Sequence, residues 1–303
     1  MRLASGSQAT FANHALQHAH SGRMVAVEVY YEVEGVSSGN SPANLIDLRR
    51  YPIVDLASPA ARALAQDCRA QLDRTGACEL PAFLTESAVE QMVAEGDRLA
   101  TAAYHSASTG TPYLEVPDRS LPEDHPRRIL DRTSVGVVAY DRFPADSLIR
   151  MLYEWDPLME FIAAALGKPR LYRYADPFGA LNLAVMGDGD RLHWHYDMTD
   201  FVTSIALRPA EHGGDFDYVP LIRSATDENY PRVQKLLLGA EDGMVRVPMT
   251  PGTLLLFEGR NSIHRVTPID GATTRLVALL AYDTKPGTTS TKLLQMARYG
   301  RTA

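Results

Sequence analysis

Apolar residues in the first half of the chain recur every three or four positions, the spacing of one face of a helix. This pattern predicts helices over residues 58–72, 85–103 and 147–166. A β-prone run predicts a short strand over residues 77–84, between the first two helices. Four prolines predict that residues 106–132 form a loop, because proline breaks regular elements. The first half therefore reads as mainly helical.

The pattern changes at residue 171, after which short β-prone runs are separated by Gly, Pro or Asp. The expected strands are 181–185, 192–196, 201–207, 216–219, 244–247, 253–257, 264–268 and 275–282. Many short strands of this kind are typical of a barrel or a double-sheet jelly roll. The polar segment 223–243 reads as a partly helical insertion between two of them. We therefore expect an α+β protein, with supporting helices packed on a jelly-roll core.

This reading divides the chain into three regions: a flexible N-terminus over residues 1–24, a helical supporting region over 25–170, and a β-rich catalytic core over 171–303. The last two are expected to form one integrated domain. Residues 1–24 are rich in Ala, Ser, Gln and His, and have few large apolar residues. His14, His18 and His20 could bind a metal there, but a frayed terminus is the simpler interpretation.

Composition narrows the class of protein. The chain has 303 residues, a net charge of -7 and 45% hydrophobic residues, so it can form a large core. An acidic chain is a poor candidate for sequence-independent nucleic-acid binding. The sequence contains no apolar run long enough for a membrane span and no signal-peptide pattern. Cys68 and Cys78 have no CxxC partner, which favours reduced thiols in a cytoplasmic protein. The sequence does not indicate an oligomeric state.

The candidate chemistry centres on the run Leu192-His-Trp-His-Tyr-Asp. Residues i and i+2 of a strand point to the same face, about 6.6 Å apart, so His195 and Asp197 would project together. His264, next to a predicted strand, is the expected third ligand. Two His and one carboxylate leave positions open on a metal, as ferrous oxygenases need, whereas a structural zinc site is filled. His193 could replace Asp197 in the set, but no carboxylate would then remain.

Arg275 follows His264 by eleven residues, on the next predicted strand. A guanidinium can hold a carboxylate through two parallel hydrogen bonds. An anionic co-substrate that chelates iron at one end needs such an anchor for its other end. The two-His, one-carboxylate set and Arg275 together therefore favour an oxygenase with an acidic co-substrate.

His-x-Asp, a distant His and then an Arg resemble the iron(II)/2-oxoglutarate-dependent oxygenases, across roughly residues 75–285. Three phrases resemble their bacterial lysine halogenases and free-amino-acid hydroxylases: Asp176-Pro-Phe, Trp194-His-Tyr-Asp and Gly213-Gly-Asp-Phe-Asp-Tyr-Val-Pro. The resemblance implies a double-stranded β-helix. It implies iron on His195, Asp197 and His264, 2-oxoglutarate on Arg275, and O₂ as the oxidant.

One departure from that pattern is informative. The halogenases of the subgroup have Gly where Asp197 stands, so the resemblance implies oxygenation instead of halogenation. The expected reaction is hydroxylation of an aliphatic C–H bond of a small free amino acid or derivative, in natural-product biosynthesis. Oxidative cyclisation or desaturation of such a substrate is an alternative. A non-catalytic metal-binding jelly roll, or a cofactor-independent isomerase, are alternatives of other classes.

Several other residues are weaker candidates. Asn182 could bind 2-oxoglutarate or fill an ordinary strand position. His193 could face the substrate, Asp200 could meet a substrate amine, and Arg132, with Arg128, could hold a substrate carboxylate. Surface or salt-bridge roles are the simpler interpretation of the charged residues. The loop 106–132, the insertion 223–243 and the tail through Tyr299 are candidate lids.

Overall fold

The computed structural model describes residues 12–15, 27–30 and 41–303. Residues 1–41 and 42–303 are separate units, and the first contains an antiparallel pair, β1 (Ala12–Ala15) and β2 (Val27–Tyr30). Most of the region 1–24, with His18 and His20, lies outside the described residues, and no side chain of β1 is described. The expectation of a flexible N-terminus therefore stays a prediction.

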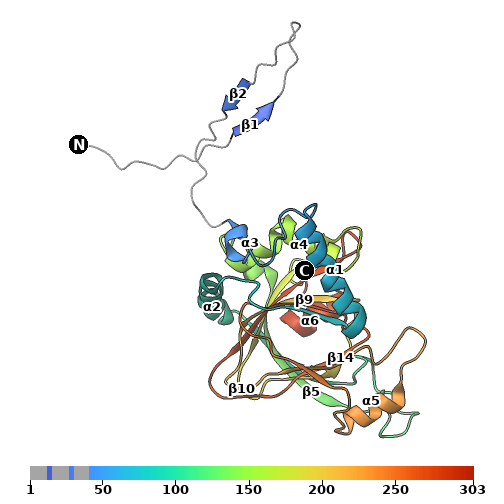
Figure 1. The fold of residues 1–303 in the computed structure, drawn as a ribbon. Helices are drawn as coiled ribbons and strands as arrows, with labels where there is room; N and C mark the ends of the chain where they lie inside the picture. Colours follow the sequence, from blue (N-terminus) through green and yellow to red (C-terminus); the bar gives the residue numbers. More distant parts are fainter. Residues whose placement is uncertain (1–11, 16–26, 31–40) are drawn as a thin grey trace. The chain divides into compact units, whose positions relative to one another are not determined.

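The second unit is built on a seven-stranded antiparallel sheet, which we call the major sheet (Figure 1). Its strands, in spatial order, are β3 (Ala77–Leu80), β13 (Leu254–Phe257), β9 (Val202–Arg208), β16 (Arg275–Leu280), β7 (Leu181–Met186), β5 (Asp131–Val138) and β4 (Tyr104–Gly110). Strands that are distant in sequence are neighbours in this order, so the sheet joins segments from residue 77 to residue 280.

A four-stranded antiparallel sheet, the minor sheet, supplies the other layer. Its order is β12 (Val245–Val247), β11 (Phe216–Val219), β14 (Ile263–Val266) and β8 (Leu192–His195). Two short pairs complete the strands: β10 (His212–Gly213) with β15 (Ile269–Asp270), and β6 (Tyr172–Arg173) with β17 (Tyr282–Asp283). Two such sheets facing each other form the expected double-stranded β-helix.

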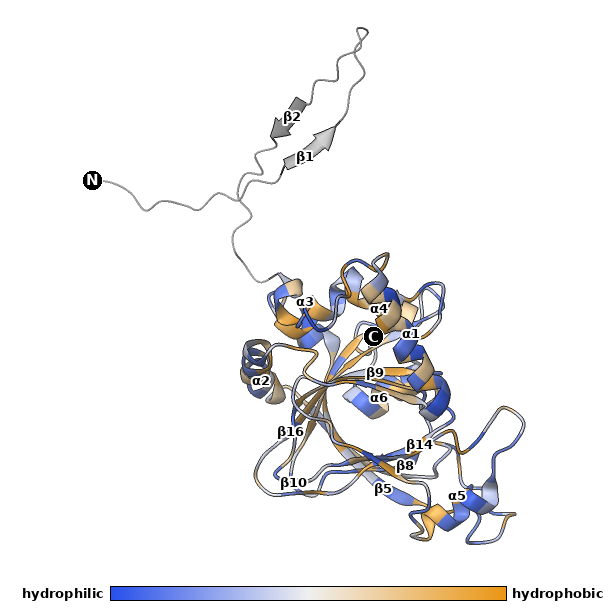
Figure 2. Cartoon of the chain, in the orientation of Figure 1, coloured by the Kyte–Doolittle hydropathy of each residue, from blue (hydrophilic) through white to orange (hydrophobic). Residues whose placement is uncertain are grey.

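Helices cover the outer face of the major sheet. They are α1 (Pro59–Thr75), α2 (Glu86–Ala100), α3 (Leu148–Glu154) and α4 (Asp156–Ala165), with 3₁₀ turns at Pro42–Leu45 and Tyr140–Arg142. Their apolar faces share one core with β7, β9, β13 and β16. In Figure 2, α1 is mainly hydrophilic in colour, whereas α3 and β9 carry hydrophobic colour. None of the described helices is both long and apolar enough to span a bilayer.

Strand alternation gives the major sheet two different faces. On β16, Leu276 and Ala278 pack in the helix-side core, while Val277 packs in a second cluster that contains residues of both sheets. Tyr218 of β11 and Phe257 of β13 belong to that second cluster. Side chains on the inner face of either sheet therefore meet in one space, and the candidate site lies there.

Two helices lie apart from this cover. Helix α5 (Tyr230–Leu237) lies between β11 and β12, so the prediction of a partly helical insertion at 223–243 is confirmed. Helix α6 (Lys292–Tyr299) contacts β4 and β5. In Figure 1, α6 is drawn between β9 and β14. The sequence analysis named this segment as a candidate lid but did not predict a helix in it.

Three expectations differ from the structure. Residues 104–110 and 131–138 are strands, because the prolines occupy only the connection between them. The helix expected over 147–166 is two helices, since Trp155 is extended and the second helix starts at Asp156, with Pro157 in its first turn. The boundary at residue 170 does not separate helices from core, because β3, β4 and β5 belong to the major sheet.

Candidate metal centre

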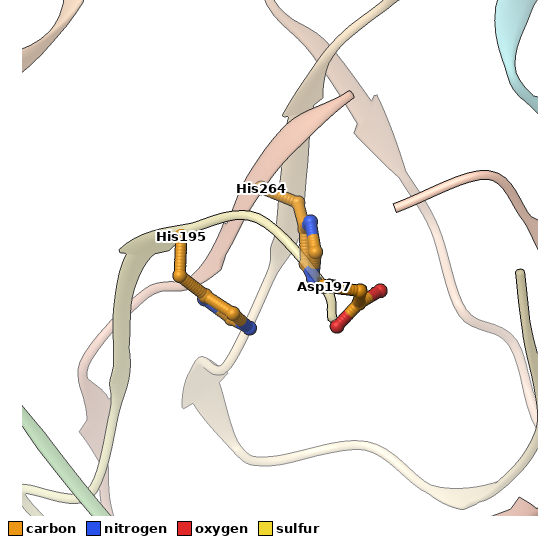
Figure 3. Close-up of side chains that lie close together, drawn as sticks. All are labelled: His195, Asp197 and His264. Carbon is orange, nitrogen blue, oxygen red and sulfur yellow. Dashed lines mark ion pairs between the residues drawn. The ribbon is translucent and has the colours of Figure 1, made fainter. Parts of the chain in front are cut away.

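Three predicted ligands lie together on the inner face of the minor sheet (Figure 3). His195 is the last residue of β8, and His264 lies directly across from it on β14. Their ring centroids are 4.2 Å apart. Asp197 follows two residues after His195, and one donor atom from each of the three residues lies within 4.8 Å of the others. The structure thus brings together the three residues that the sequence singled out.

Backbone carbonyls fix both imidazole rings. His195 Nδ1 lies 2.7 Å from the carbonyl oxygen of His193, and His264 Nδ1 lies 3.0 Å from that of Ser262. A carbonyl can only accept, so each Nδ1 donates its proton and each Nε2 is the ring nitrogen left for a metal. His264 Nε2 is 3.6 Å from Asp197 Oδ2. Metal-binding histidines are commonly oriented in this way.

The protonation states of two of these residues suit metal binding. Burial lowers the pKa of His195 to about 3, and the adjacent His264 imidazole acts in the same direction. Burial alone would raise the pKa of Asp197, but the two imidazoles, chiefly that of His264, and the charge of Arg298 together lower it. His195 is therefore neutral and Asp197 ionised near neutral pH. Two imidazole nitrogens and one carboxylate are the donor set that non-haem Fe(II) centres use.

Gly259 makes room for Asp197, a role that the sequence analysis missed. A Cβ atom at Gly259 would lie 1.8 Å from Asp197 Oδ2, so only glycine fits. The carbonyl of Gly259 also accepts a hydrogen bond from the Asp197 backbone amide, 3.1 Å away. On the other side, the ring of Phe257 lies 4.9 Å from that of His264. Gly259, which is distant from Asp197 in the sequence, therefore positions the carboxylate, and Phe257 packs against the His264 ligand.

Arg275, the expected anchor for an anionic co-substrate, is buried at the start of β16. It is the first residue of β16, shares the inner face with Val277, and is only 5% exposed. Burial lowers its pKa to about 10, against the opposing charge of Asp215, so it stays protonated near neutral pH. Among the described residues it forms no ion pair, and its Nη1 contacts Met186 Sδ at 3.8 Å. Met186 packs on Val266, two residues beyond His264.

Asn182 is buried on β7, but its amide is already used within the protein. Its Nδ2 donates to the carbonyls of Phe178, at 2.8 Å, and Leu181, at 2.7 Å. Its Oδ1 accepts a hydrogen bond of 2.9 Å from the Tyr299 hydroxyl of α6. These contacts fit the positioning of α6, and the expected role of Asn182 toward 2-oxoglutarate stays a prediction.

His193 lies beside the candidate ligands but is held by other groups. Its ring centroid is 5.8 Å from that of His195. Its Nδ1 contacts the Thr133 hydroxyl, and its Nε2 lies 3.3 Å from the carbonyl of Thr111. Burial lowers the pKa of His193, so it is neutral near pH 7. It belongs to the wall of the site, with Thr133 and Thr111 behind it.

The weaker charged candidates lie further out. Asp200 is exposed and forms an ion pair of 2.6 Å with Arg260. Arg132 neighbours Thr133 on β5, so strand alternation points it away from His193, and it lines a surface pocket with His105. Arg128 donates to the Leu121 carbonyl in the connecting loop. None of these contacts places a side chain beside His195.

The described part of the chain contains this one candidate centre. Within residues 12–15, 27–30 and 41–303, no other set of three His, Cys, Asp or Glu side chains is close enough to bind a metal together. Cys68 and Cys78 are free and buried, in α1 and β3 respectively. The donor set contains no thiolate and no fourth protein ligand, which does not fit a structural zinc site.

Comparison with known proteins gives the family. The sequence profile of the Halogenase D family matches residues 60–295, which is more than half of the chain. A search of curated protein sequences finds no match.

Solved structures agree on the fold. AviO1 from Streptomyces viridochromogenes Tue57 is 17% identical, with a TM-score of 0.51, covering 78% of this chain and 99% of that chain. SnoK, a non-heme alpha ketoglutarate dependent carbocyclase from nogalamycin biosynthesis, is 16% identical, with a TM-score of 0.51 and coverages of 73% and 85%. A prolyl hydroxylase from Trichoplax adhaerens is 17% identical, with a TM-score of 0.50 and coverages of 74% and 90%. The chain therefore belongs to the Halogenase D family and has the double-stranded β-helix fold of the 2-oxoglutarate- and iron(II)-dependent oxygenases.

Proposed function

We propose that this protein is an iron(II)- and 2-oxoglutarate-dependent oxygenase, with His195, Asp197 and His264 as the metal ligands. One observation carries the proposal: a two-His, one-carboxylate donor set shares the space between the sheets with Arg275, a buried guanidinium without an ion pair in the described chain. A non-catalytic metal-binding protein has no need of this second feature. Burying an unpaired charge is costly, so a charged ligand is expected to compensate it.

The chain contributes placement and protection. The imidazoles of His195 and His264 are fixed by the carbonyls of His193 and Ser262, so the ligands need little reordering. Arg275 binds the distal carboxylate of 2-oxoglutarate, and His193 forms a wall toward the substrate. With Fe(II), 2-oxoglutarate and O₂ bound, the centre supplies an oxidant that can attack an aliphatic C–H bond.

Asp197 decides between two outcomes of this chemistry. A carboxylate in the donor set occupies the position that a halide would need, and Gly259 is shaped around that carboxylate. We therefore propose hydroxylation instead of halogenation, although the chain belongs to a family named for halogenases. Oxidative cyclisation and desaturation use the same donor set and stay open alternatives. Product mass separates them, since hydroxylation adds one oxygen and the alternatives remove two hydrogens.

The proposed substrate is a small free amino acid or a close derivative, of the kind used in natural-product biosynthesis. This part of the proposal is supported by the resemblance of the phrases around Asp176, Trp194 and Gly213 to amino-acid-modifying enzymes. A panel of the twenty common L-amino acids, scored by succinate formed per 2-oxoglutarate consumed and by product mass, tests it. Uncoupled succinate formation alone, with every amino acid unchanged, would contradict the substrate class but not the cofactors.

The cofactor assignment has a direct test. Anaerobic protein mixed with Fe(II) and 2-oxoglutarate should develop a weak visible charge-transfer band. The band should be absent in His195→Ala and in His264→Ala, and present in His105→Ala, a histidine that lines a surface pocket elsewhere. Circular dichroism of each variant shows whether it is folded. Folded wild-type protein without the band would refute the proposed function.

A further inference from the structure

Asp197 lies beyond the end of a strand, so sheet hydrogen bonds do not hold it in place. Strand β8 ends at His195, and the chain bends through residues 196–200 before β9 begins at Val202. Met198, the residue after Asp197, is 71% exposed, so this segment reaches the surface of the protein. A metal ligand on such a segment needs supporting contacts that keep its carboxylate in one position.

Arg260, in the turn between β13 and β14, contacts this segment at two points. Its Nε donates to Asp200 Oδ1 at 2.6 Å, and its Nη2 donates to the carbonyl of Met198. The carbonyl of the preceding residue, Gly259, accepts a hydrogen bond of 3.1 Å from the Asp197 amide. Residues 259 and 260 therefore hold the segment at positions 197, 198 and 200, which include the ligand itself.

Arg223 supports Arg260 and also contacts the segment directly. Its Nε donates to the Arg260 carbonyl at 2.6 Å, and its Nη1 pairs with Glu228 Oε2 at 3.0 Å. Its guanidinium carbon lies 3.8 Å from the ring centroid of Tyr196, which is buried, so the two side chains form a cation–π contact. Because Tyr196 directly precedes Asp197, the two arginines contact residues on both sides of the ligand.

The ion pair of Arg260 with Asp200 contributes little by itself. The two side chains are 46% and 69% exposed, and exposed ion pairs are weakened by water and salt. The contact to the Met198 carbonyl is different, because it fixes the main chain next to Asp197. A guanidinium that donates to both groups sets the direction of the segment as well as its place. We therefore expect Arg260 to affect metal binding more than global stability.

We propose that Arg260 is a positioning residue that keeps the carboxylate of Asp197 beside the two imidazoles of the centre. With Arg223 behind it, Arg260 fixes the main chain of residues 196–200 and so restricts where that carboxylate can lie. The proposal rests on the proposed function, because it requires Asp197 to be a metal ligand. Since the effect of Arg260 passes through Asp197, it should disappear in a protein that lacks that carboxylate.

The test measures metal affinity in a double-mutant cycle. Wild type, Arg260→Ala, Asp197→Ala and the double variant are titrated with Ni(II) by calorimetry, after circular dichroism has shown that each is folded. Ni(II) is the probe because nitrogen and oxygen sites bind it more tightly than Fe(II), so weakened variants stay measurable. The control is Arg173→Ala, whose guanidinium likewise contacts a carboxylate, that of Asp156 at 2.8 Å, and a carbonyl, that of Glu154 at 2.6 Å.

We expect Arg260→Ala to bind Ni(II) about tenfold more weakly than wild type, the lower end of the loss seen when the support of a metal ligand is removed. Arg260→Lys should recover part of the loss, because an ammonium can meet one of the two acceptors but does not have the fork that reaches both. Arg173→Ala should match wild type. In the Asp197→Ala background, removing the Arg260 side chain should change the affinity by about twofold at most.

Two results would overturn the proposal. One is equal Ni(II) affinity of wild type and Arg260→Ala. The other is the same loss with and without Asp197, which would show that Arg260 acts through another part of the protein. Wild type that binds neither Ni(II) nor Fe(II) would instead refute the proposed function itself.

Discussion

The hydroxyl of Tyr299 donates a hydrogen bond of 2.9 Å to Asn182 Oδ1, joining the last residue of α6 to the inner face of β7. The ring of Tyr299 also packs edge-on against Phe178, with centroids 5.6 Å apart. This contact fixes a segment that the sequence offered as a candidate lid against β7. It also gives the buried amide oxygen of Asn182 a hydrogen-bond donor.

Replacing Tyr299 with Phe should loosen α6 without unfolding the protein. The change removes one buried hydrogen bond and leaves Asn182 Oδ1 without its donor, which costs about 1–2 kcal/mol locally. Amide hydrogen exchange in residues 290–303 should become faster, and amino-acid binding should weaken, while Fe(II) binding is retained. Tyr172→Phe, in the distant strand β6, is the control. Unchanged exchange in the variant would show that the hydroxyl does not hold the helix.

Asp176→Asn should release the segment that leads into α6, with a defined pH dependence. The carboxylate accepts hydrogen bonds from the amides of Phe178 and Gly179, both at 2.8 Å, from that of Ser290 at 2.6 Å, and from Gln295 Nε2. Burial alone would raise the pKa of Asp176, but these N–H donors outweigh it and the pKa is lowered.

Because the folded-state pKa of Asp176 is below the unfolded value of about 3.9, its stabilisation is present above that value. It is lost as the pH falls through the folded pKa. Wild type should therefore be more stable than Asp176→Asn by about 2 kcal/mol at pH 7. Urea unfolding at pH 7, 5, 4 and 3 should show this difference shrinking below pH 4. A difference that grows toward acid pH would contradict the assignment.

Gly259→Ala should weaken metal binding in a folded protein. The new Cβ would meet Asp197 Oδ2 at 1.8 Å and displace the carboxylate from the two imidazoles. Changes that disturb the support of a ligand reduce metal affinity by about 10–100-fold. Anaerobic titration with Fe(II) measures the loss. Gly187→Ala is the matched control, because a Cβ there meets no atom within 4 Å. Equal Fe(II) affinity of the two variants would show that the space around Asp197 is not limiting.

Arg275→Met should separate stability from co-substrate binding. Removing a buried guanidinium that has no ion pair in the described residues should leave the ligand-free melting temperature unchanged or higher. The increase in melting temperature that 2-oxoglutarate causes should disappear, with affinity reduced about thirtyfold or more. The control is Arg208→Met, which removes a guanidinium that already has an ion-pair partner within the protein, Asp97 at 2.7 Å. A variant that 2-oxoglutarate still stabilises like wild type would refute the role of Arg275.

The order of residues within short stretches of the sequence determined several helices and part of the candidate metal centre. The spacing of two residues brought His195 and Asp197 together, although β8 ends at His195. Helices α1 and α2 followed from apolar spacing and from caps such as Ser58 and Gly76. These features depend on neighbours within a few residues, which a sequence displays directly. The strand at residues 131–138 was not predicted, because it begins with polar residues and follows a proline-rich loop. Its sequence therefore shows no clear alternation of apolar and polar residues.

Only the tertiary structure decided how distant segments meet. The pairing of β14 with β8 sets His264 opposite His195, and a shift of one residue would have turned it to the other face. Gly259 against Asp197 and Tyr299 against Asn182 are likewise contacts between segments 62 and 117 residues apart, respectively. Such contacts depend on sheet register and packing, which are properties of the whole fold, so residue types and short-range spacing do not reveal them.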